Sequence, residues 1–143
     1  MEALESREFP QTMPKNSAVL RVLVVDDEPL IRWSLAQTLT ERGHRVVETE
    51  DAASTRAAID EEFDVVLLDY RLPDSDNLSL LASIRNRAPR TPVILMTAYG
   101  APDVVRGAVE LGAYRVIGKP FDIAAVADLV AEAHAEGIAS GSH

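Results

Sequence analysis

The sequence contains no cysteine, which excludes disulfide bonds, thiolate metal sites and cysteine nucleophiles. Basic residues are scarce, since 14 Lys and Arg stand against 23 Asp and Glu, giving a formal net charge of −9 at pH 7. Nucleic acids are bound through Lys and Arg, so direct nucleic-acid binding by this chain is disfavoured. No apolar stretch approaches the roughly 18 residues of a membrane helix, and the first 17 residues hold no hydrophobic signal segment. These absences predict a cytoplasmic protein that acts away from membranes.

The remaining composition predicts one globular domain. The chain has 143 residues, of which 47% are hydrophobic and 26% charged, which is ordinary for a single folded unit. Residues 1–17 are polar and contain Pro10 and Pro14, so we expect a flexible N-terminal tail. Residues 137–143 are small and polar, and we expect a flexible C-terminal tail there. The domain is therefore predicted to span residues 18–136.

Within this domain, short apolar runs alternate with helical patterns. Strands are expected at residues 19–25, 45–49, 65–68, 93–96 and 114–118. The first, third and fourth runs are apolar throughout, as central strands are, whereas the second and fifth each carry an arginine, as edge strands can. Five β-α units of this kind predict an α/β fold, a doubly wound parallel sheet with helices on both faces. We expect the flavodoxin-like (βα)5 order 2-1-3-4-5, in which ligands bind at the carboxyl ends of the strands.

Polar residues follow the strands at this predicted edge. They are Asp26, Asp27 and Glu28 after the first strand, Asp69 after the third, Thr97 after the fourth and Lys119 after the fifth. Carboxylates crowded together repel, by roughly 4 kcal/mol for two unit charges about 4 Å apart near a protein surface, so the cluster predicts a bound cation. Oxygen ligands without His or Cys favour Mg²⁺. A metal, an ammonium and a hydroxyl together suit a phosphoryl group, which a carboxylate can accept as an acyl phosphate.

Each of these residues has a structural explanation when it is taken alone. An acid after a strand is often a helix N-cap, and Asp69 could begin a turn. Thr97 could bond to the backbone, and Lys119 could be a solvated surface lysine. Their joint occurrence, in this order and at these strand ends, is what predicts a site that binds a cation and a phosphoryl group.

Four segments carry a resemblance to a known family. VLVVDDE, VVLLDYRLPDSD, ILMTAYG and GKPF, in this order and spacing, resemble the receiver domain of two-component response regulators. The match covers about residues 20–136. The segments IRWSLAQTL, MTAYG and GKPFDI are most similar to receivers of the nitrogen-regulatory class, which usually precede an ATPase and a DNA-binding domain. The resemblance implies a signalling switch of a phosphorelay rather than an enzyme.

The resemblance also implies which residues carry the reaction. Asp69 would accept a phosphoryl group from the phosphohistidine of a sensor histidine kinase or of a histidine phosphotransfer protein. Asp27 and Asp69 would coordinate Mg²⁺ together with the backbone carbonyl of Arg71, and Asp26 would act on the metal through water.

Thr97 and Lys119 would bind the phosphoryl oxygens, and the Lys119–Pro120 peptide bond would be cis. The conformational response would reach an output face made by helix 102–112, strand 114–118 and helix 122–136. This face would bind a downstream effector or output domain, or a second copy in a homodimer.

The sequence departs from the family at two positions. Val116 stands where an aromatic residue is common, three positions before the lysine, and neither Tyr99 nor Tyr114 replaces it. Asn77 stands where a glycine is common, eight positions after Asp69, and asparagine tolerates left-handed backbone angles better than most residues.

Two other functions fit parts of the pattern. A phosphohydrolase of the haloacid-dehalogenase type would use Asp26 as nucleophile with Glu28 as its acidic partner, which leaves Asp69 without a role. A flavin-binding module would share the fold, but the acidic loop after the first strand would repel a flavin phosphate. Trp33 is expected to be a partly buried packing residue, and the three histidines are assigned no chemistry.

Overall fold

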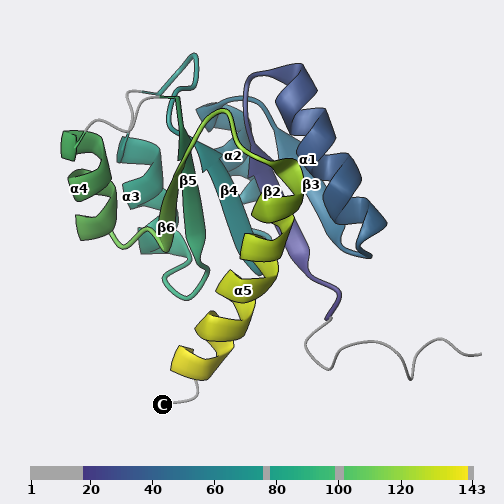
Figure 1. The fold of residues 1–143 in the computed structure, drawn as a ribbon. Coiled ribbons are helices and arrows are strands. Elements are labelled where there is room, and N and C mark those ends of the chain that lie inside the picture. Colours follow the sequence, from purple (N-terminus) through teal and green to yellow (C-terminus); the bar gives the residue numbers. More distant parts are fainter. Residues whose placement is uncertain (1–17, 76–77, 99–101, 142–143) are drawn as a thin grey trace, which may run out of the picture.

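The computed structural model describes residues 18–75, 78–98 and 102–141 and confirms the predicted α/β fold. Strands and helices alternate along the chain (Figure 1). The strands are β2 (Arg21–Val25), β3 (Arg45–Thr49), β4 (Val65–Asp69), β5 (Val93–Thr97) and β6 (Arg115–Gly118). The helices are α1 (Pro29–Glu41), α2 (Ala52–Ala58), α3 (Leu78–Arg87), α4 (Pro102–Glu110) and α5 (Ile123–Gly141).

The five strands form one parallel sheet in the order β3-β2-β4-β5-β6. Counted along the chain, this is the predicted order 2-1-3-4-5. Side chains of β2 alternate between two cores: Val22 and Val24 pack under α1 and α5, whereas Leu23 and Val25 pack under α2, α3 and α4. A strand that is buried on both faces needs apolar residues at successive positions, which explains the continuous apolar runs of the central strands.

The helices differ from expectation in two details. Trp33 was expected to be partly buried, but 58% of its surface is exposed, because α1 directs Leu35 and Leu39 rather than Trp33 into the core. The last helix was expected to end at residue 136, but α5 continues to Gly141, and no proline interrupts it. Among the helices in the described ranges, none is long and apolar enough to cross a membrane.

The carboxyl ends of the strands meet at one edge of the sheet. Asp69, the last residue of β4, pairs with Met96, and Thr97, the last residue of β5, pairs with Gly118. The amide of Lys119 donates to the carbonyl of Thr97 at 2.8 Å, which joins the loop after β6 to β5. The Lys119–Pro120 peptide bond is cis, as predicted. The fold thus brings the loops with the predicted site residues together.

Candidate functional site

Asp26 is a fully buried carboxylate at the end of β2. One carboxylate oxygen accepts a hydrogen bond from the amide of Glu28 at 2.9 Å, and the other accepts one from Nζ of Lys119 at 2.9 Å. Its backbone carbonyl accepts a hydrogen bond from the guanidinium of Arg32 at 2.7 Å. Burying a charge is tolerated only when the charge is paired and hydrogen-bonded, and these contacts fix the position of Asp26.

Asp69 lies beside this group and is only 5% exposed. Its Oδ1 accepts a hydrogen bond from the amide of Arg71 at 3.3 Å, and its Oδ2 lies 3.4 Å from Nζ of Lys119. Burial, together with the negative charge of Asp26, raises the pKa of Asp69 to about 7, although Lys119 partly opposes the shift. Ionised Asp69 is therefore a poorly solvated carboxylate, which a cation in the same pocket would stabilise.

Lys119 is the cation that the protein itself supplies. Its side chain is 9% exposed, and its Nζ lies 2.7 Å from Glu28, 2.9 Å from Asp26 and 3.4 Å from Asp69. Burial by itself would lower the pKa of Lys119, but the hydrogen bonds to Glu28 and Asp26 and the charge of Asp69 outweigh it and raise the pKa. Lys119 therefore stays protonated and is positioned to bind further anionic groups in the pocket.

Three carboxylates converge closely enough to hold a metal ion. Within the described part of the chain, the candidate group consists of Asp26, Glu28 and Asp69, whose ligand oxygens lie within 4.8 Å of one another. Oxygen ligands alone suit a hard divalent cation such as Mg²⁺. The residues present therefore fit a magnesium ion, and the predicted crowding of acids at this edge occurs.

The remaining predicted residues lie around this group. Thr97 is buried at the end of β5. Arg71 lies in the loop after β4, where its amide contacts Asp69. Asp27 is exposed and is not part of the group of three converging acids. The metal-ligand roles of Asp27 and of the Arg71 carbonyl stay predictions from the family resemblance.

Sequence reasoning did not predict that Glu28 contacts Lys119 and belongs to the acidic group in the pocket. The chain bends at Asp27, and Glu28 reaches Lys119 in the pocket beside Asp26, whereas Asp27 is exposed. Its position in the run of three acids after β2 was the only sequence signal, and that run does not say which of the acids meet. Arg32 was also missed; it contacts the carbonyl of Asp26 and forms an ion pair with Glu48 at 3.3 Å, which ties the acidic loop to β3.

The two departures from the family pattern have different outcomes. Val116 is partly buried and packs on the core beneath α2, α3 and α4, so an aliphatic side chain occupies this position on β6. Asn77 and Tyr99 lie outside the described residues.

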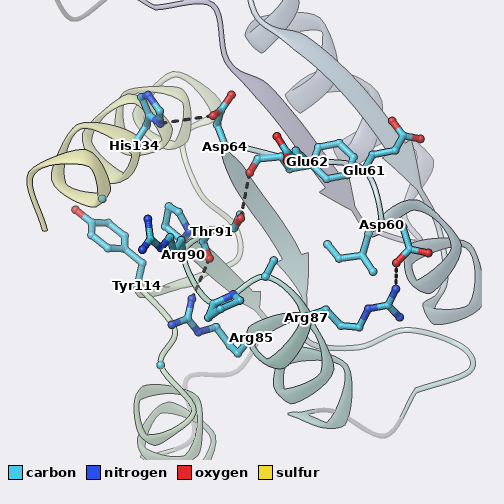
Figure 2. Close-up of a pocket in the computed structure, with 17 residues that line it drawn as sticks. Asp60, Glu61, Glu62, Asp64, Arg85, Arg87, Arg90, Thr91, Tyr114 and His134 are labelled. Carbon is cyan, nitrogen blue, oxygen red and sulfur yellow. Dashed lines mark hydrogen bonds and ion pairs between the residues drawn. The ribbon is translucent and has the colours of Figure 1, made fainter. Parts of the chain in front are cut away.

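A broad, open hollow lies at the opposite, amino-terminal edge of the sheet (Figure 2). Its walls come from the loops before β4 and β5 and from α5, and Figure 2 shows that their polar groups contact one another. Asp60 pairs with Arg87, and the hydroxyl of Thr91 donates to the carbonyl of Phe63 at 3.1 Å. These contacts connect neighbouring loops, and the hollow is separate from the acidic pocket.

The two histidines in the described part of the chain, His44 and His134, lie away from the acidic pocket. Nδ1 of His44 accepts a hydrogen bond from the amide of Leu20 at 3.1 Å, and Nδ1 of His134 lies 4.0 Å from Asp64 (Figure 2). Both are placed as structural residues, and His143 lies outside the described residues.

Comparison with known proteins agrees with this geometry. Residues 22–131 match the response regulator receiver domain family. The response regulator protein FleR of Pseudomonas aeruginosa is 41% identical over 123 residues, which cover 85% of this chain and 26% of FleR. The DNA-binding transcriptional regulator NtrC of Escherichia coli is 40% identical over 113 residues, which cover 78% of this chain and 24% of NtrC. The chain thus spans about a quarter of the length of these curated relatives.

Solved structures of receiver domains are also similar to this chain. A CheY-like response regulator receiver domain protein from Methanospirillum hungatei superposes with a TM-score of 0.82 at 27% identity, covering 86% of this chain and 99% of that one. The BeF3-activated receiver domain of Nitrogen Regulatory Protein C superposes with a TM-score of 0.72 at 38% identity, covering 82% of this chain and 96% of that one.

Proposed function

Because this chain belongs to the response regulator receiver domain family, we propose that it is a phosphorylation switch in which Asp69 is the phosphoacceptor. The main support for this proposal is the position of Asp69. It is a buried carboxylate at the end of β4, its Oδ2 lies 3.4 Å from Nζ of Lys119, and it is close to Asp26 and Glu28. Family membership makes the chain a signalling module of a two-component system and implies a histidine kinase as partner. The donor would be the phosphohistidine of that kinase or of a histidine phosphotransfer protein.

The reaction is an in-line transfer between a nitrogen and an oxygen. An Oδ atom of ionised Asp69 attacks the phosphorus, and the P–N bond to the histidine ring breaks. The electron pair of that bond stays on the ring nitrogen, which leaves as neutral imidazole because the other ring nitrogen keeps its proton. The product is an acyl phosphate, and Lys119 and Thr97 would bind its oxygens.

Mg²⁺ would be held by Asp69 and the neighbouring oxygen ligands. The carboxylates that converge here are Asp26, Glu28 and Asp69, and the family resemblance implies Asp27 and the Arg71 carbonyl as further ligands. When bound, Mg²⁺ neutralises charge that develops on the phosphoryl oxygens. The protein's own contribution is to keep Asp69 buried and fixed in direction by the amide of Arg71.

The signal would leave through the face formed by α4, β6 and α5. This face would bind a homodimer partner, an effector or an output domain, and the reaction would take place in the cytoplasm. The aliphatic Val116 on β6 means that the response cannot involve an aromatic ring at that position. DNA contact by this chain itself is not expected, because its net charge is −9.

Phosphorylation is tested by incubating the protein with acetyl phosphate and Mg²⁺ and measuring its intact mass. We expect one added phosphoryl group, which is lost in Asp69→Asn or with a chelator and kept in the control Asp103→Asn, an exposed acid on α4. Borohydride reduction followed by peptide mapping identifies the modified residue. Modification of Asp26 instead of Asp69 would favour the phosphohydrolase, and a protein that takes up no phosphoryl group would refute the proposal.

A further inference from the structure

Glu28 occupies a helix N-cap position without capping the helix. It precedes Pro29 at the start of α1, and within the described residues its side chain makes no capping hydrogen bond. Short polar side chains such as Asp and Ser are the ones that cap a helix at this position, and glutamate is not among them. The carboxylate of Glu28 instead reaches across the pocket to Lys119, on the loop after β6. The described hydrogen bond of the Glu28 side chain is therefore the one to Lys119, 91 positions away in sequence.

The contacts of Lys119 are unequal. Its ammonium is closest to Glu28, at 2.7 Å, and farthest from Asp69, at 3.4 Å. An ammonium has three hydrogens to donate, and the hydrogen bonds to Glu28 and Asp26 use two of them. Lys119 therefore contacts all three carboxylates, but its two hydrogen bonds go to the loop after β2 and its longer ion pair goes to Asp69.

The two acids that hold Lys119 differ in how easily they can release it. Asp26 is fully buried and is fixed by the amide of Glu28. The side chain of Glu28 is 57% exposed, so water can solvate its carboxylate once the contact opens. Exposed ion pairs are weak, which makes the contact between Glu28 and Lys119 the one that can be exchanged for another anion.

We propose that Glu28 is a positioning residue that holds Lys119 before phosphorylation and competes with the incoming phosphoryl group for its ammonium. The inference rests on the proposed function of Asp69 and adds that Glu28 limits the rate at which Asp69 is phosphorylated. Formation of the acyl phosphate would require Lys119 to leave Glu28. Weakening this contact should therefore speed up phosphorylation and make Lys119 more accessible.

Accessibility of the lysine can be measured without any phosphodonor. The chain has only two lysines, Lys15 and Lys119, so acetylation by an N-hydroxysuccinimide ester in chelator buffer, read by peptide mapping, gives the rate at Lys119 with Lys15 as internal reference. We expect the ratio to rise about two- to fivefold in Glu28→Gln, the range for losing an exposed ion pair. Glu28→Asp should act similarly, because it keeps the charge but shortens the side chain by roughly 1.5 Å.

Competition is then measured as the initial rate of phosphorylation by acetyl phosphate at saturating Mg²⁺. We expect both Glu28 variants to be about two- to fivefold faster than the wild type. Glu41→Gln, at the other end of α1, changes the net charge equally and should leave both rates unchanged. A Mg²⁺ titration of each variant identifies a metal-binding role, which would raise the Mg²⁺ requirement of Glu28→Gln.

The outcomes separate this inference from the proposed function. Unchanged labelling of Lys119, or an unchanged or slower reaction at saturating Mg²⁺, overturns the inference while a phosphorylated wild type leaves the function of Asp69 standing. If labelling rises but no variant and no wild-type protein takes up a phosphoryl group, the proposed function and the competition are both wrong, and only the contact is confirmed.

Discussion

The clustered acids should destabilise the metal-free fold, and Asp69→Asn should relieve this. Burial and Asp26 raise the pKa of Asp69 from 3.8 to about 7, so the folded protein binds a proton there more tightly than the unfolded chain does. Stability from this group is therefore full below the unfolded pKa and is lost as the pH rises through the folded pKa. At about 1.4 kcal/mol per pH unit, ionised Asp69 lowers the unfolding free energy by roughly 4 kcal/mol at pH 8 and by about 1.5 kcal/mol at pH 5.

Urea unfolding followed by circular dichroism in chelator measures this effect. We expect Asp69→Asn to gain at least about 2 kcal/mol at pH 8, after relaxation of the pocket, and clearly less at pH 5. The control Asp103→Asn removes an exposed acid and should change stability by less than about 0.5 kcal/mol. Adding Mg²⁺ should stabilise the wild type more than the variant. A gain that is absent at pH 8, or equal at both pH values, would show that Asp69 is not a strained charge.

Three further changes test the fold. Asp74 accepts hydrogen bonds from the amides of Ala52 and Ala53, so Asp74→Ala should cost about 1 kcal/mol and speed hydrogen exchange at these amides; unchanged exchange would disprove the cap. Burial and a nearby arginine lower the pKa of His44, so its contribution to stability should be lost as the pH falls below about 6.5, and the difference between wild type and His44→Asn in urea midpoint should shrink there. Leu67→Ala empties a fully buried site in β4 and should cost about 2–5 kcal/mol in urea unfolding; a smaller loss would mean that the core refills the space.

The fold could be predicted from sequence because backbone constraints leave few choices. Val65–Leu68 is apolar at four successive positions, which is typical of a strand covered on both faces. Arg45 and Arg115 mark the edge strands, where their side chains remain exposed. Parallel strands joined by helices then place all carboxyl ends at one edge, and this is enough to bring Asp26, Asp69 and Lys119 together.

The partners of individual side chains could not be predicted in the same way. Three acids follow β2, and residue type alone does not say which two face the pocket. That depends on the bend of the chain at Asp27, after which Glu28 reaches Lys119 beside Asp26. The long reach of Glu28 to Lys119 depends on the path of the loop after β6. The exposure of Trp33 similarly depends on the rotation of α1, which a pattern of spaced leucines defines only approximately.

The charges in the pocket favour Glu28 as the group that is released on phosphorylation. Asp26, Glu28 and Asp69 carry three negative charges and Lys119 one positive charge, so one divalent cation would neutralise the group. Phosphorylation replaces the single charge of Asp69 by one of about −2, which leaves an excess negative charge. Asp26 is fully buried and has no access to water that could replace its partners. The side chain of Glu28 is 57% exposed and can turn into water, so the electrostatic change favours release of the carboxylate that lies nearest to Lys119.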